Sequence, residues 1–282
     1  MIWGRLLFLV LSATLSLPPA HADQLWMSTP HVEPRAVSVV IHGLNLKPEK
    51  MDEIATFLTA RGSEVLRVSL TGHHGDIEAR KDITRQLWTQ EVFQAYTEAR
   101  AHADRLQVPL YFVGYSLGAV LNLDVLLHQS ARYDKMIFFA PAIENKAPEG
   151  IMRFLRHLLG KSGSLFSLNL KEYRAHDSTS FTMYVALLDS ENAVHEKGLQ
   201  TLAGIPTLIF LDPDDETVSF DRTAKLLHDS QLEPAWKLIP VNNNGSTLRK
   251  KYHHLIIDRE SVGVAQWRTL ERAMDEHLDL LK

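Results

Sequence analysis

The 282-residue chain contains no cysteine. Disulfide bonds, a cysteine nucleophile and lipid attachment through an N-terminal cysteine are therefore excluded for this sequence. The absence says nothing about compartment, since an oxidising space permits disulfides without requiring them. Basic residues are not concentrated either: the net charge is −4, and the most basic stretch is the short run Arg249–Lys251. Because nucleic-acid-binding domains carry clustered Lys and Arg, we expect no nucleic-acid partner.

The N-terminal segment differs in composition from the rest. Leu6–Leu17 is an apolar run broken only by small residues, Arg5 precedes it, and two prolines follow it. Ala20 and Ala22 occupy the small-residue positions that signal peptidases recognise. The run is shorter than the roughly 20 residues of a membrane span, although an uncleaved anchor is the alternative. We therefore expect residues 1–22 to be a signal peptide cleaved after Ala22, and the mature protein to be periplasmic or secreted.

From residue 23 onward, short β-branched runs alternate with longer segments of helical periodicity. This alternation predicts an α/β fold, with a mostly parallel central sheet and helices on both faces. Continuous apolar character, as in Ala36–Ile41, is typical of strands covered on both faces. The predicted strands are Ala36–Ile41, Val65–Leu70, Leu110–Val113, Met136–Phe139, Thr207–Leu211 and Trp236–Ile239. The main predicted helices are Ile83–Leu106, Leu117–His128, Phe220–His228 and a C-terminal helix around Trp267–Leu281.

A long segment, residues 143–200, breaks this rhythm. It lies between the fourth predicted strand and the next clear one, so we expect a helical cap or lid inserted into the single domain formed by residues 23–282. Gly150–Lys161 within it reads as an amphipathic helix whose apolar stripe includes Phe154 and Leu158. That stripe is either ordinary core or a lid that meets an acyl chain or a membrane surface.

Gly114–Gly118 has the sequence Gly-Tyr-Ser-Leu-Gly, a G-x-S-x-G pattern. The pattern alone is weak, but an apolar strand leads into it and an apolar helix leaves it. A strand–turn–helix context of this kind is what a nucleophile elbow requires. The turn would hold the Ser116 hydroxyl out at the carboxyl end of the sheet, so Ser116 is the predicted nucleophile.

Two further motifs carry a family resemblance. His42–Leu44 resembles the oxyanion-loop HG motif of α/β-hydrolases, and Leu70–Asp76 resembles the loop after the next strand in their lysophospholipase and monoacylglycerol-lipase branch. The resemblance extends over about residues 36–282 and includes carboxylesterases and S33-type serine aminopeptidases. It implies an α/β-hydrolase fold and an oxyanion hole formed by the backbone N–H groups of Leu44 and Leu117. The imidazole of His42 is interpreted as bracing its own loop, because the donor must be a backbone amide.

The order nucleophile, acid, base in that family places the acid after the strand that follows the cap. That strand opens into the acidic run Asp212–Ser219. Asp215 is favoured because Asp215–Val218 resembles the family's D-x-x-V turn, and Asp214 is the main alternative. The remaining carboxylates would cap a helix or lie in solvent.

The base is expected after the last strand, where two histidines are adjacent. Related carboxylesterases have a histidine followed by four mostly apolar residues and an aspartate. Alignment on Asp258 favours His253 as the base, and His254 remains the alternative. The histidine not used would pack or donate a hydrogen bond nearby.

These features predict an exported serine hydrolase that cleaves small-molecule or lipid esters through a Ser-His-Asp triad and an acyl-enzyme. No cofactor or metal is expected: no H-E-x-x-H motif occurs, and His73–His74 lacks a nearby third ligand. The alternatives are an amidase or peptidase of the same family, and an inactive binding protein. The sequence does not indicate the acyl-chain length or the oligomeric state.

Overall fold

Seven strands form the central sheet of the protein, which we describe from a computed structural model over residues 23–74, 78–146, 149–167, 169–250 and 252–280. The strand order is β1-β3-β2-β4-β5-β8-β9. β1 runs antiparallel to β3, and the other neighbouring pairs are parallel. The strands are β1 (Asp23–Met27), β2 (Ala36–Ile41), β3 (Ser63–Ser69), β4 (Leu110–Tyr115), β5 (Lys135–Phe139), β8 (Thr207–Leu211) and β9 (Trp236–Pro240).

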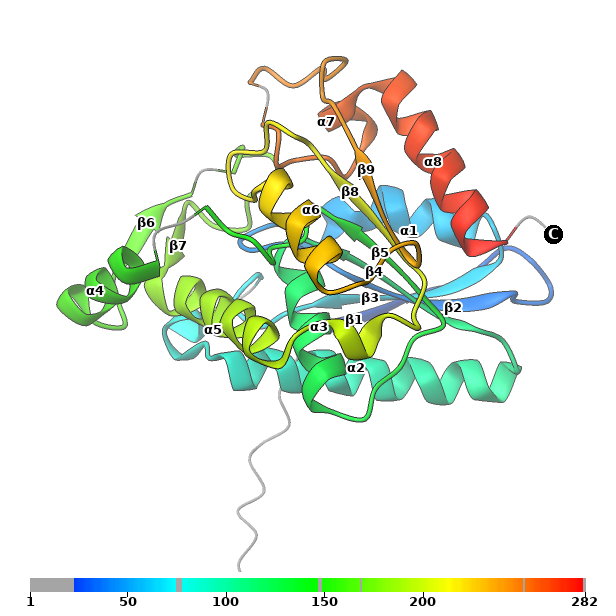
Figure 1. Ribbon diagram of the computed structural model, residues 1–282, viewed down its shortest axis with the longest axis horizontal. Coiled ribbons are helices and arrows are strands. Elements are labelled where there is room, and N and C mark those ends of the chain that lie inside the picture. The colour runs from blue at the N-terminus through cyan, green and yellow to red at the C-terminus, as the bar shows by residue number, and fades with distance from the viewer. Residues whose placement is uncertain (1–22, 75–77, 147–148, 168, 251, 281–282) are drawn as a thin grey trace, which may run out of the picture.

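Helices cover both faces of this sheet (Figure 1). Side chains of a strand point alternately to opposite faces, and β2 shows the consequence. Val37, Val39 and Ile41 pack with α2 and α3, whereas Ala36 and Val40 pack with α1 and α8. The fold is therefore the α/β architecture that the alternation of elements predicts. The helices outside the cap are α1 (Asp52–Thr59), α2 (Arg85–Leu106), α3 (Leu117–His128), α6 (Phe220–Asp229), α7 (Arg259–Val262) and α8 (Val264–Leu278).

The segment between β5 and β8 contains two helices and a small hairpin. They are α4 (Glu149–Leu159), β6 (Ser164–Phe166), β7 (Ser178–Ser180) and α5 (Phe181–Lys197), with β6 antiparallel to β7. α5 packs against α3 of the main core, and α4 packs on α5. α4 and the hairpin project to one side in Figure 1. This segment thus has one half built into the core and one half that overhangs it.

The predicted elements match the observed ones to within two residues at most of their ends. β2, β8 and α3 have the predicted bounds. β1 is missed by the sequence patterns, since five residues at a sheet edge give little periodicity. The predicted signal peptide, residues 1–22, lies outside the described residues. Within the described part of the chain, no helix is long and apolar enough to cross a membrane.

Candidate active site

A strained turn presents Ser116 at the carboxyl end of β4. The Ser116 backbone has φ 49° and ψ −108°, a conformation that L-residues rarely adopt and that costs about 1–3 kcal/mol. The Ser116 N–H donates to the Phe139 carbonyl (2.9 Å), which ties the turn to β5. A Cβ on Gly114 would lie 2.6 Å from the Phe112 ring, and one on Gly118 2.6 Å from the Ile41 carbonyl oxygen. Both glycines are therefore required by close approach.

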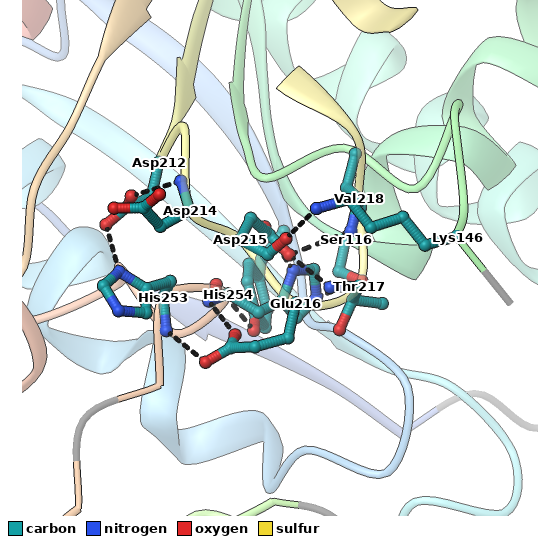
Figure 2. Close-up of polar contacts among 11 residues, drawn as sticks. Ser116, Lys146, Asp212, Asp214, Asp215, Glu216, Thr217, Val218, His253 and His254 are labelled. Atoms are coloured by element: carbon teal, nitrogen blue, oxygen red, sulfur yellow. Dashed lines mark hydrogen bonds and ion pairs between the residues drawn. The ribbon is translucent and has the colours of Figure 1, made fainter. Parts of the chain in front are cut away.

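His254 lies between Ser116 and Asp215 (Figure 2). Its Nε2 is 3.0 Å from Ser116 Oγ, and its Nδ1 is 2.7 Å from Asp215 Oδ2. Both distances lie within the range required for proton transfer between positioned groups. The three side chains come from loops that follow β4, β8 and β9, and the carboxyl ends of these parallel strands share one edge of the sheet. The fold therefore forms a continuous Ser–His–Asp hydrogen-bonded chain, although Ser116 and His254 are 138 positions apart in the sequence.

His253 has a different partner. Its Nδ1 is 3.0 Å from Asp212 Oδ2, and among the described residues it makes no hydrogen bond to Ser116. Burial lowers the pKa of His253, but the hydrogen bond and charge of Asp212 outweigh this effect and raise the pKa overall. The alignment on Asp258 favoured His253, whereas the geometry favours His254. Asp258 itself caps α7, where it accepts the Ser261 N–H (2.8 Å).

Asp215, rather than the alternative Asp214, faces His254. Its Oδ1 accepts the backbone N–H groups of Thr217 (2.7 Å) and Val218 (2.9 Å). Burial raises the pKa of Asp215, but the charge and hydrogen bond of His254 and the two N–H donors outweigh burial and lower the pKa below its usual range. Asp215 is therefore held as a carboxylate. Asp214 is exposed, and its backbone N–H donates to Asp212 (2.9 Å).

Glu216 is a site residue that the sequence analysis did not identify. Its carboxylate accepts the backbone N–H groups of both His253 and His254, each at 3.1 Å (Figure 2). In the sequence it is one of several acids in a polar run, and nothing there indicates that it reaches residues 37 and 38 positions away. Glu216 fixes the main chain that carries the histidine pair.

The two predicted oxyanion donors flank the same serine. Leu117 is the first residue of α3, and Leu44 lies in the loop after β2. Within the described ranges, neither backbone N–H donates to a protein acceptor. Leu44 lines the cavity beside Ser116, so its amide is near the place where an acyl oxygen would lie. Gly43 allows this loop to lie close to the Tyr115 ring, because a Cβ at position 43 would be 2.6 Å from that ring.

His42 braces the loop as expected. It is fully buried, and its Nε2 accepts the Leu70 N–H (3.0 Å) while its Nδ1 contacts the Gly43 carbonyl (2.9 Å). Since Nε2 accepts, the proton must be on Nδ1. Burial lowers the pKa of His42 to about 4, which keeps the ring neutral. The Gly43 carbonyl belongs to the same peptide group as the Leu44 N–H, so His42 fixes the direction of that donor.

A cavity of about 320 Å³ opens beside Ser116 and His254. That size suits a small organic ligand. Lys146 and Glu216 bring charge to its wall, and the Lys146 ammonium is held by the Asp215 backbone carbonyl. The apolar part of the wall comes from Leu44, Tyr115, Met152, Leu165, Leu187 and Leu188.

Three side chains next to the site have the chemistry of metal ligands. Atoms of Asp212, Asp214 and His253 lie within 4.8 Å of one another. The His253–Asp212 ion pair already accounts for two of them, so the cluster needs no ion to explain it. The adjacent histidines His73 and His74 have separate partners: His73 is buried against His42, with ring centroids 4.3 Å apart, and His74 Nδ1 is 2.6 Å from the Ser69 hydroxyl.

Proteins of known structure share the fold of this chain. A family model described as serine aminopeptidase, S33, matches residues 32–204. Among curated proteins, none matches the chain. A solved structure reported with the metagenome-derived lipolytic enzymes LipS and LipT has a TM-score of 0.70 at 18% identity, over 93% of this chain and 99% of that one. Monoglyceride lipase from Saccharomyces cerevisiae, in complex with a substrate analogue, has a TM-score of 0.69 at 14% identity. The match covers 94% of this chain and 97% of the lipase chain. Est1E from Butyrivibrio proteoclasticus, bound to ferulic acid, has a TM-score of 0.57 at 19% identity. The match covers 92% of this chain and 96% of the Est1E chain.

A buried carboxyl of α2 is bonded to the loop that follows β3. Glu91 of α2 is inaccessible to solvent and accepts hydrogen bonds from the backbone N–H of Thr71 (3.0 Å) and from its hydroxyl. Burial raises the pKa of Glu91 to about 7, and the two bonds from Thr71 offset only part of that effect. The folded state therefore holds this proton more tightly than the unfolded chain does.

This linkage gives a pH-dependent stability. The raised pKa of Glu91 stabilises the fold fully below pH 4.5, and the contribution is lost as pH rises to about 7. Between pH 4.5 and pH 8 the wild type should therefore lose about 3 kcal/mol of unfolding free energy through this group. Glu91→Gln has no titrating carboxyl at this position and should not show this loss. Urea unfolding at both pH values measures the difference. Glu33→Gln, at an exposed position, is the control. Equal pH dependence in wild type and Glu91→Gln would refute the assignment.

Proposed function

The chain belongs to the serine aminopeptidase S33 family, and from this premise we propose that it is a serine hydrolase that cleaves carboxylic esters. The observation that carries the proposal is the hydrogen-bonded chain Ser116–His254–Asp215 at the wall of a partly apolar cavity. Lipolytic enzymes and a monoglyceride lipase with the same fold support the ester as substrate class.

In the proposed reaction, His254 Nε2 removes the Ser116 proton as Oγ attacks the acyl carbon. The carbonyl oxygen becomes an alkoxide, which the N–H groups of Leu44 and Leu117 stabilise. The imidazolium then gives its proton to the leaving alcohol, and the C–O bond of the ester breaks. A water molecule, deprotonated by His254, attacks the acyl-enzyme, and Ser116 leaves with the proton.

Asp215 contributes through its charge and position. Its Oδ2 accepts a hydrogen bond from the N–H at His254 Nδ1, which leaves Nε2 unprotonated and able to act as the base. The lowered pKa keeps Asp215 ionised, so it stabilises the imidazolium that forms in the transition state. His253 has no such connection to Ser116, and its ion pair with Asp212 gives it a structural role.

The adjacent histidines provide a matched test of the site. His254→Ala and Asp215→Asn should each lower kcat for p-nitrophenyl butyrate by about 10⁴-fold with little change in KM, because both act in the transition state. His253→Ala should change kcat by less than about tenfold, since it removes only an ion pair with Asp212. A large loss in His253→Ala with a mild effect in His254→Ala would reverse the assignment.

The same assay separates ester from amide chemistry. An amidase or peptidase would use the same residues, so p-nitrophenyl esters are compared with aminoacyl p-nitroanilides on the wild-type protein. The proposal expects the esters to be turned over far faster. An inactive binding protein would turn over neither.

The lid forms a second part of the proposal. Met152 of α4 and Leu165 of β6 line the cavity, whereas Phe154 and Leu158 of α4 are 62% and 65% exposed and Phe166 is 87% exposed. Exposed apolar side chains gathered next to a ligand cavity mark an interaction surface. Arg156, also on α4, brings positive charge beside them. We propose that this outer face makes transient contact with lipid surfaces that present the substrate.

Removal of the outer side chains tests the lid. Phe154→Ser with Leu158→Ser should lower the hydrolysis of long-chain esters in anionic vesicles while leaving soluble butyrate esters and the melting temperature unchanged, because both side chains are exposed. Met152→Ser is the control: it changes the cavity wall and should affect the soluble ester as well. A lowered melting temperature and an equal loss on all esters would instead show that the stripe is ordinary core.

The proposal retains export, which rests on the composition of residues 1–22 alone. An extracytoplasmic location would give a lipid-binding lid access to membrane esters.

A further inference from the structure

A segment of the cap lies along the loop that carries one oxyanion donor. We call Asn169–His176 the strap. Leu46 pairs with Arg174 in an antiparallel bridge, and the Lys47 N–H donates to the Tyr173 carbonyl (2.8 Å). The strap thus adds a short strand-like contact to residues 44–47.

The loop forms a turn that needs support. The Leu46 N–H donates to the Gly43 carbonyl (3.3 Å), which closes a four-residue turn. Asn45 has φ 51°, a left-handed conformation that side chains other than glycine adopt with some strain. The side chain of Asn45 is held by the backbone of His176, through Oδ1 and Nδ2 at 2.9 Å each.

The amide of Asn169 holds the centre of this turn. Its Nδ2 lies 3.1 Å from the carbonyl oxygens of both Leu44 and Asn45. Both partners are acceptors, so the NH₂ end of the side chain must face them, and each of its two hydrogens has one acceptor. Asn169 also lines the cavity beside Ser116.

These bonds hold the two peptide groups that follow the donor residue Leu44. The peptide between Leu44 and Asn45 is the central one of the turn, and its rotation interconverts turn types I and II. Both turn types keep the closing bond between Leu46 and Gly43, so that bond alone does not fix the central peptide. The Gly43 carbonyl, before Leu44, is held by His42, and the Leu44 carbonyl is held by Asn169, so the two contacts together hold Leu44 from both sides. The Asn169 bond to the Leu44 carbonyl opposes that rotation.

We propose that Asn169 is a positioning residue for the oxyanion hole: it fixes the turn that presents the Leu44 N–H, and so couples the position of the cap to stabilisation of the transition state. This inference rests on the proposed function. Its consequence is that a correctly placed cap is required for turnover of even the smallest esters, independently of acyl binding.

Asn169→Asp removes the two hydrogen-bond donors of the amide but keeps the size and shape of the side chain. The carboxylate has the size of the amide but turns an oxygen toward two carbonyl oxygens. Loss of an oxyanion donor costs about 10²–10³-fold in kcat, and a displaced donor should cost part of this, about 10–100-fold. KM for p-nitrophenyl acetate should change less than about threefold. Asn169→Ala removes the donors without adding charge and should give a smaller loss of the same kind. Asn242→Asp, at an exposed loop position, is the matched control and should leave kcat unchanged.

A second readout distinguishes positioning from general disruption. Phenylboronic acid forms a tetrahedral adduct that resembles the transition state, whereas butyramide resembles the ground state. The inhibition constant of phenylboronic acid should rise in parallel with the loss of kcat in Asn169→Asp and Asn169→Ala, and that of butyramide should not. Unchanged kcat and boronate affinity in either folded variant, with an active wild type, would overturn this inference alone. A wild-type protein without ester turnover would overturn the proposed function and the inference with it.

Discussion

The backbone of Ser116 is the constraint on which the rest of the site depends. Its positive φ holds the hydroxyl out of the sheet, and the strained turn is stable because strand and helix on either side are deeply buried. The surroundings leave no room for side chains at Gly114 or Gly118. Loops at the same edge of the sheet bring His254 and Asp215 into a hydrogen-bonded chain with this hydroxyl, which is the arrangement that the proposed reaction requires.

The cap contributes to that convergence at two places. At its beginning, the Lys146 backbone N–H donates to the Thr217 carbonyl (2.7 Å), and the Lys146 ammonium donates to the carbonyl of Asp215. Further on, Asn169 and the rest of the strap hold the turn around Leu44. The acid loop and the oxyanion loop are therefore both braced by the segment that also forms the cavity wall. Substrate binding and catalytic geometry share the same supports.

The sequence predicts every strand of the central sheet except β1, most helix bounds and the elbow at Ser116, because these depend on local periodicity and on a turn with strict glycine requirements. It does not decide between His253 and His254. A shift of one residue in this loop changes which imidazole contacts Ser116, and no local sequence pattern indicates the position of the loop. Asp258, which guided the alignment, is a helix cap. Glu216 and Asn169 escape prediction for a related reason: their partners are backbone groups far away in the chain.

The central claim is that Ser116 is the residue that becomes acylated. Treatment of the wild-type protein with a fluorophosphonate, followed by peptide mass spectrometry, tests it most directly. The account predicts one covalent adduct, on Ser116, because this hydroxyl alone among the described serines is hydrogen-bonded to a histidine that is itself paired with a buried carboxylate. An adduct on a different residue, or a folded wild-type protein that forms none, would contradict it.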